Sequence, residues 1–155
     1  MKAIITISKT FFPGHPRAGE ATEFREKVLS GTKIHTCRQN YPYWWRQIER
    51  IQATDGILCV KQWIDRPYHQ PGQEPIVNIP ADVVGVQRLQ LWRTKTSTSY
   101  DWIALVHGSP VFLEVLAAND GLTVEDFKAW FAPAFKKAHA EYLEFAIIHF
   151  TRLRY

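Results

Sequence analysis

The chain has 155 residues, of which 46% are hydrophobic and 22% are charged. This composition is typical of one globular domain with its own core, and it excludes a disordered chain. The formal net charge of +4 mildly favours an anionic partner, although no long basic run forms an electrostatic tail. No apolar segment reaches the ~20 residues that cross a bilayer, and no segment resembles a signal peptide. We therefore expect a single domain over residues 1–155, cytoplasmic and without membrane association.

The first half of the chain is predicted to contain two helices between short strands. Apolar residues at helical spacing predict a helix over 20–30, which a glycine ends. A second helix is predicted over 43–52, because its apolar residues fall on one face. Apolar and β-branched runs predict extended segments over 3–7, 33–38 and 56–63, followed by a proline- and glycine-rich loop over 64–75.

The second half is predicted to contain three strands and a helical region. Strands are expected over 83–92, 102–106 and 145–153, with an exposed hairpin tip over 94–99 and a turn over 108–110. Thr123 and Asp126 form a capping pair that predicts a helix over 123–131, and Pro133 begins a further short helix. Five or six strands and three or four short helices that do not alternate regularly favour an α+β barrel with peripheral helices.

The segment from Gly31 to Arg38 holds the most informative group of polar side chains. Residues two apart on a strand share a face, so Thr36 and Arg38 are expected to point the same way. Lys33 joins them if the chain kinks at Gly31, because a glycine just past a helix end usually takes a left-handed conformation. A cation, a hydroxyl and a guanidinium would then converge. Such a group can bind a phosphate or a nucleobase, or transfer a proton.

The pattern Gly31-x-Lys33-x-x-Thr36-x-Arg38 resembles the G-x-K-x-x-T-x-R signature of the ASCH family, and all four positions match. ASCH domains are β-barrels that resemble the PUA domains that bind RNA. The resemblance runs from about residue 24 to the end of the sequence. It implies a PUA-like β-barrel of five to six strands with three to four peripheral short helices.

Two later features also resemble the family. An acidic residue, Asp120, lies in a loop just before the 123–131 helix, and an aromatic-rich helical turn follows it. The last predicted strand has the aromatic and aliphatic pattern of the closing strand of such a barrel. The family has a glutamate at the loop position, so Asp120 is one methylene shorter.

One bacterial branch of the family hydrolyses the acetyl amide of N4-acetylcytidine. The resemblance implies that Lys33 would be the activating base, Thr36 the nucleophile and Asp120 the acid partner. A lysine can be such a base only if burial or nearby positive charge lowers its pKa. Arg38 is a nearby positive charge, and it could also stabilise the developing oxyanion.

Three functions are open on the sequence. We expect recognition of RNA or of a modified nucleoside, in which Lys33 and Arg38 contact a phosphate or a base edge and aromatic rings stack on bases. The second function is the amidohydrolase, and the third is a protein-interaction domain whose signature residues are idle. A catalytic Lys33 should be buried, whereas a phosphate-binding Lys33 can be exposed. The residues expected to bind the ligand are Gly31, Lys33, Thr36, Arg38, Trp44, Trp45, Trp63 and Tyr68.

We expect neither a metal nor a cofactor. The six histidines are scattered, without an H-x-x-x-H pair, and the two cysteines, Cys37 and Cys59, form no C-x-x-C motif. The sequence has no phosphate-binding loop and no dinucleotide-binding motif. The sequence leaves the oligomeric state open.

Overall fold

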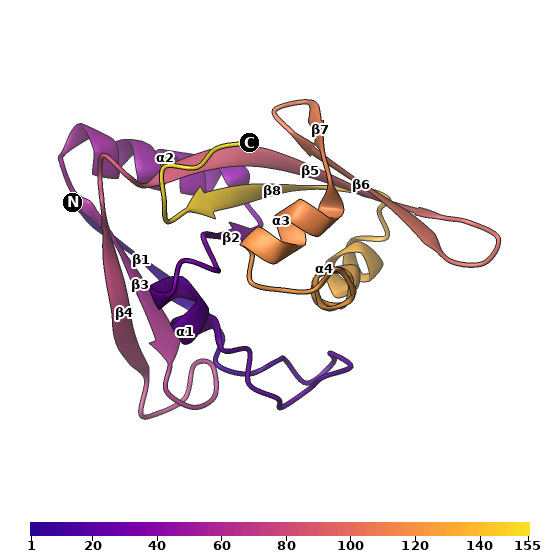
Figure 1. The fold of residues 1–155 in the computed structure, drawn as a ribbon, viewed down its shortest axis with the longest axis horizontal. Coiled ribbons are helices and arrows are strands. Elements are labelled where there is room, and N and C mark those ends of the chain that lie inside the picture. The colour runs from indigo at the N-terminus through magenta and orange to yellow at the C-terminus, as the bar shows by residue number, and fades with distance from the viewer.

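Two β-sheets and four helices make up this α+β fold, and the computed structural model describes residues 1–155 (Figure 1). The smaller sheet has the strand order β1-β3-β4. Its strands are β1 (Lys2–Ile7), β3 (Ile57–Trp63) and β4 (Gln73–Pro80). β1 pairs parallel with β3, and β3 pairs antiparallel with β4. Residues near the start of the chain therefore lie beside residues more than fifty positions later.

The larger sheet has the strand order β2-β8-β5-β6-β7, and all its pairs are antiparallel. Its strands are β2 (His35–Arg38), β5 (Gly85–Lys95), β6 (Tyr100–Val106), β7 (Ser109–Val111) and β8 (Tyr142–His149). The short β2, which carries the second half of the signature, is an edge strand of this sheet. The two sheets are separate, and neither one closes on itself.

The four helices are α1 (Phe24–Leu29), α2 (Tyr41–Ala53), α3 (Leu113–Asn119) and α4 (Val124–Ala138). The predicted cap of α4 is confirmed, because the Thr123 hydroxyl accepts a hydrogen bond from the Asp126 backbone N–H at 3.1 Å. None of the helices is both long and apolar enough to span a membrane.

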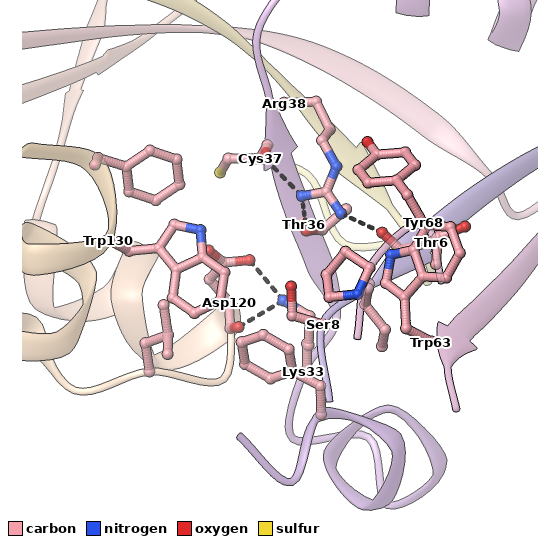
Figure 2. Close-up of a pocket in the computed structure, with 15 residues that line it drawn as sticks. Thr6, Ser8, Lys33, Thr36, Cys37, Arg38, Trp63, Tyr68, Asp120 and Trp130 are labelled. Carbon is pink, nitrogen blue, oxygen red and sulfur yellow. Dashed lines mark hydrogen bonds and ion pairs between the residues drawn. The ribbon is translucent and has the colours of Figure 1, made fainter. Parts of the chain in front are cut away.

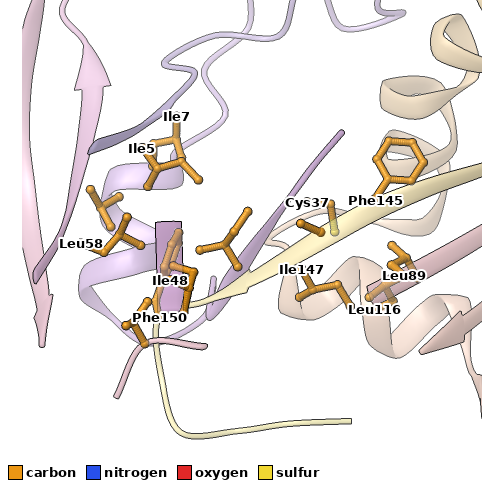
Figure 3. Close-up of a cluster of buried hydrophobic side chains, with 14 of the residues drawn as sticks. Ile5, Ile7, Cys37, Ile48, Leu58, Leu89, Leu116, Phe145, Ile147 and Phe150 are labelled. Carbon is orange, nitrogen blue, oxygen red and sulfur yellow. The ribbon is translucent and has the colours of Figure 1, made fainter. Parts of the chain in front are cut away.

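A single cluster of 28 buried hydrophobic residues joins the sheets and the helices. Figure 3 shows Ile5 and Leu58 of the smaller sheet gathered with Ile48 of α2, while Ile147 and Leu89 of the larger sheet lie on the other side of the view with Leu116 of α3. Each fully buried side chain of this kind stabilises the fold by about 1.5–3 kcal/mol. The core therefore fixes the position of both sheets, and with them the residues at their ends.

The strand count is higher than predicted, with eight strands instead of five or six. The prediction missed β4, because Pro75 near its start and Pro80 at its end are typical of loops. β4 is an edge strand, where proline is tolerated, and the register shifts by one residue between Val60 and Lys61 of β3. The predicted turn over 108–110 was wrong in part, since its last two residues belong to β7.

The helices also differ from the prediction. α3 was missed, and α4 is one helix that continues through Pro133 instead of two helices. An internal proline costs about 3 kcal/mol. Phe127, Phe131 and Phe135 lie four residues apart on α4 and are all buried. Their burial outweighs the lost hydrogen bond, because each contributes about 1.5–3 kcal/mol.

The predicted kink at Gly31 is confirmed. Gly31 has φ of +78°, its N–H donates to the Val28 carbonyl at 3.2 Å, and the Thr32 N–H donates to the Lys27 carbonyl at 2.8 Å. This pair of bonds is the Schellman motif that ends many helices. It turns the chain sharply between α1 and β2, so that Lys33 lies in the turn before the strand.

We predict that Gly31→Ala lowers the free energy of unfolding by about 1–2 kcal/mol, because a β-carbon disfavours the left-handed conformation. Gly31→Asn is the matched control and should cost less, since asparagine adopts this conformation more readily. No atom lies within 4 Å of the added β-carbon, so steric overlap does not contribute. Urea unfolding of the three proteins measures the effect. Equal stability of the alanine variant and the parent would contradict this account of the turn.

Candidate functional site

A cavity of about 330 Å³ lies where the two sheets meet the α3–α4 turn (Figure 2). Its walls come from the end of β1, from β2, from the loop after β3 and from α4. The structure brings six of the predicted site residues to this cavity, namely Lys33, Thr36, Arg38, Trp63, Tyr68 and Asp120. They come from three distant parts of the sequence, so the fold and not the local chain creates the site.

Lys33 and Asp120 form a buried ion pair at the base of the cavity. The Lys33 Nζ donates to Asp120 Oδ1 at 2.8 Å and to the Asp120 backbone carbonyl at 2.7 Å. The side chains are only 1% and 5% exposed. The Phe24 ring centroid lies 4.2 Å from the same Nζ. The ammonium therefore has a carboxylate, a carbonyl and an aromatic face as partners, in place of water.

The α3–α4 turn places Asp120 against Lys33. Asp120 caps the C-terminus of α3, and Gly121 follows it with φ of +80°. A β-carbon on Gly121 would approach the Lys33 Cβ to 3.1 Å, so glycine permits the two segments to meet. Lys27 of α1 donates to the Gly121 carbonyl at 2.9 Å and holds the turn from the other side.

Burial and charge act against each other at this pair. Burial lowers the pKa of Lys33, and although Asp120 opposes this effect, the shift remains downward. Burial alone would raise the pKa of Asp120, but the charge of Lys33 and the contact with His35 outweigh it and hold that pKa below its usual range. Asp120 is therefore a carboxylate at neutral pH, while Lys33 gives up its proton more easily than a lysine in water.

Arg38 connects the signature to the smaller sheet. Its Nη1 donates to Thr36 Oγ1 at 2.9 Å and to the Cys37 carbonyl at 3.0 Å, and its Nη2 donates to the Thr6 carbonyl at 2.7 Å. A cation that donates to a hydroxyl oxygen stabilises its deprotonated form. The Thr36 hydroxyl accepts from Arg38, so its own proton is free for another acceptor.

Aromatic rings form two sides of the cavity. Trp63 and Tyr68 pack together with ring centroids 5.0 Å apart, and Trp130 of α4 stands on the opposite side, with the polar residues between them (Figure 2). Tyr68 is 89% exposed and marks the opening. Flat rings on both sides of a narrow cavity favour a planar ligand.

Three predicted ligand-binding residues do not line this cavity. Trp44 is half-buried on α2 and packs against the hydrophobic core, while Trp45 is 42% exposed on the same helix. α2 packs on β5 and β8, away from the turn that carries Asp120. Gly31 acts through the backbone turn and contributes no surface to the cavity.

The structure adds cavity residues that the sequence prediction missed. Trp130 and Phe131 face the cavity from α4, and Cys37 lines it from β2. Trp130 lies in the aromatic-rich turn after Asp120, and this turn was the one available signal for it. A second, more open groove of about 680 Å³ shares these three residues and Arg38 with the cavity and continues along α4.

A group of three potential metal ligands lies under the cavity. His35 Nδ1, Cys37 Sγ and an Asp120 oxygen are within 4.8 Å of one another. Asp120 already accepts from Lys33, and burial raises the pKa of the Cys37 thiol well above its usual value. Metal binding needs a thiolate and a free carboxylate. Two cations, Lys33 and Arg38, already lie next to the group. It is therefore poorly suited to hold a metal cation.

Two buried histidines lie behind the ion pair. His35 Nε2 is 2.6 Å from the Tyr155 hydroxyl, and His149 Nε2 is 2.9 Å from Gln87 Oε1. Burial lowers the pKa of both histidines, in the case of His149 to about 3. Both rings are therefore neutral at pH 7.

No family model, curated protein or solved structure matches this chain.

We predict that the buried His149 makes the protein sensitive to acid. Its pKa rises from about 3 in the folded protein to about 6.5 on unfolding, so the unfolded chain binds more protons between these values. As the pH is lowered below 6.5, the free energy of unfolding should therefore decrease by about 1.4 kcal/mol for each pH unit. His149→Gln removes this contribution, and its unfolding free energy should decline less steeply with pH.

Urea unfolding at several pH values between 4 and 7 measures both slopes. His69→Gln, at an exposed loop position, is the matched control and should keep the parent's slope. Identical slopes for the parent and the His149 variant would show that this histidine is not the buried neutral group described here.

Proposed function

We propose that this chain binds an N-acylated nucleoside in the cavity and hydrolyses its acyl amide. The observation that carries the proposal is the burial of Lys33, with its Nζ held by Asp120 in a cavity that Thr36 also lines. A lysine that contacts phosphates has no need to be buried, whereas a lysine that acts as a base needs a lowered pKa. The direction of the Lys33 shift supports the second role.

The size and the walls of the cavity support a nucleoside-sized ligand. A volume of about 330 Å³ lies at the lower end of the range for small-molecule sites. A base could stack against Trp63 or Trp130 with its exocyclic acyl group directed at the polar residues. The half-buried guanidinium of Arg38 donates to Thr36 and to the Thr6 carbonyl, and is therefore better placed to act on the reacting groups than on a phosphate backbone.

The proposed reaction has two steps. In the first, neutral Lys33 takes the proton of the Thr36 hydroxyl, Oγ1 bonds to the acyl carbon, and the C–N bond breaks as the nitrogen leaves with the proton from Lys33. In the second, water attacks the ester on Thr36, which releases the carboxylic acid and restores the hydroxyl. Arg38 stabilises the Thr36 oxygen as its proton leaves. Asp120 holds the lysine in place and stabilises its transient charge.

The resemblance to the ASCH family belongs to the same proposal. The three signature residues after Gly31, namely Lys33, Thr36 and Arg38, line one cavity with Asp120, as the resemblance implies for an active site. The proposal also includes a PUA-like origin of the two sheets. It further includes a cytoplasmic setting, in which the buried Cys37 and Cys59 stay reduced.

A second candidate function is binding of RNA or of a modified nucleoside without turnover. It is favoured by Tyr68, which is 89% exposed next to Trp63 at the opening. An exposed ring of this kind can stack on a base that belongs to a longer strand. Affinity for RNA would then fall as the salt concentration rises.

We predict that the parent protein converts N4-acetylcytidine to cytidine and acetate, and that Thr36→Val lowers the rate by about a hundredfold or more, because the nucleophile is lost. Valine keeps the shape of threonine. Thr98→Val, in an exposed turn, is the matched control and should keep the parent's rate. Chromatography of the nucleosides measures conversion, and circular dichroism checks that each variant is folded.

Full turnover by Thr36→Val would exclude Thr36 as the nucleophile. Absence of turnover by the folded parent would refute the hydrolase proposal for this substrate. The second candidate would then be tested by titration with single-stranded RNA at several salt concentrations.

A further inference from the structure

We infer that Tyr155 is a positioning residue for this site, and that it acts by fixing His35 in the tautomer whose Nδ1–H faces Asp120. Tyr155 follows β8 and is 120 residues from His35 in the sequence, and it does not line the cavity. Its hydroxyl is nevertheless connected to Lys33 by three contacts, through His35 and Asp120. For its effect on catalysis, the inference rests on the proposed hydrolase function.

The direction of the hydrogen bonds follows from the donors available. The Asn119 amide nitrogen can only donate, and it lies 2.9 Å from the Tyr155 hydroxyl oxygen. The hydroxyl proton has no acceptor among the protein groups other than His35 Nε2, which lies 2.6 Å away, so the hydroxyl donates to Nε2. Because Nε2 accepts this proton, the neutral ring must carry its own proton on Nδ1.

The Nδ1 side of His35 faces the ion pair. Nδ1 is fully buried, lies 3.6 Å from Asp120 Oδ1 and has no hydrogen-bond partner. The charged and titratable groups around the ring are Asp120, Lys33, Cys37, His149 and Tyr155. At 3.6 Å the contact is longer than a hydrogen bond, but the N–H dipole points at the carboxylate and stabilises its charge. The opposite tautomer would direct a lone pair at the carboxylate instead.

A backbone clamp holds Tyr155 in place. The Tyr155 N–H donates to Gln87 Oε1 at 2.9 Å, and Gln87 Nε2 donates to the Tyr155 carbonyl at 3.2 Å. Gln87 Oε1 also accepts from His149 Nε2, so His149 must carry its proton on Nε2. The two buried histidines are therefore assigned opposite tautomers, which gives the experiment an internal reference.

The contacts form one chain that ends at the ion pair. Asn119, Tyr155 and His35 each direct a proton toward the next group, and the last proton faces Asp120. Asp120 in turn holds Lys33 at 2.8 Å. An Asp120 fixed in this way presents a constant acceptor to Lys33, which keeps the amine aligned in the cavity with Thr36.

Two-bond ¹H–¹⁵N correlation spectra of the imidazole rings test the inference directly and do not require activity. In the parent protein at pH 7, we expect Nδ1–H for His35 and Nε2–H for His149. In Tyr155→Phe, which keeps the ring, the unprotonated His35 Nε2 should shift toward the frequency of a nitrogen without a hydrogen bond. Tyr142→Phe is the matched control and should leave both histidines unchanged. An Nε2–H tautomer of His35 in the parent, or no shift in Tyr155→Phe, would overturn the inference.

Steady-state kinetics on N4-acetylcytidine test the effect on the site. Because Tyr155 does not contact the ligand, Tyr155→Phe should lower kcat about three- to tenfold, the worth of one hydrogen bond, and leave KM unchanged. A raised KM with unchanged kcat would contradict a positioning role. Failure of the parent to turn over would concern the proposed reaction alone, since the spectra decide the tautomer independently.

Discussion

The buried ion pair between Lys33 and Asp120 is the interaction on which the rest of the site depends. Removing two charges from water is costly, and the attraction between them compensates only when further hydrogen bonds complete the geometry. Here the ammonium also reaches a backbone carbonyl and the face of Phe24. Loss of one partner would leave the other charge buried and alone. The turns that bring Lys33 and Asp120 together must therefore keep their geometry for the ion pair to remain intact.

Two turns that require glycine bring Lys33 and Asp120 into contact. The left-handed Gly31 ends α1 and directs Lys33 inward, and Gly121 lets the α3–α4 turn approach without a clash. The same arrangement makes the pair chemically useful, because burial that is costly for stability lowers the pKa of Lys33. The burial of Lys33 therefore costs stability while it makes the amine more reactive. The hydrogen bonds of Asn119, Tyr155 and His35 hold Asp120 in the position that keeps the ion pair intact.

The 31–38 part of the site could be predicted from the sequence, because its residues follow short-range rules. The spacing of Thr36 and Arg38 on a strand and the helix-ending Gly31 follow local rules, and the structure confirms the turn. Trp130 and Tyr155 could not be predicted, since only the pairing of β8 and the path of α4 bring them near β2. Trp44 and Trp45 were misplaced for the converse reason. They follow the signature closely in sequence, but α2 carries them onto another part of the fold. In the fold, β4 and α3 were missed because proline and short length hide their patterns.

The most direct test of this account is the pKa of Lys33 itself. Titration of lysine ¹³Cε resonances by NMR, with Lys33→Met to assign the signal, measures it in the intact protein. The account predicts that Lys33 titrates below the other lysines of the chain, as a buried amine that can become neutral. A Lys33 resonance that titrates together with the exposed lysines would contradict the account, because an ordinary ammonium cannot act as the base of the proposed reaction.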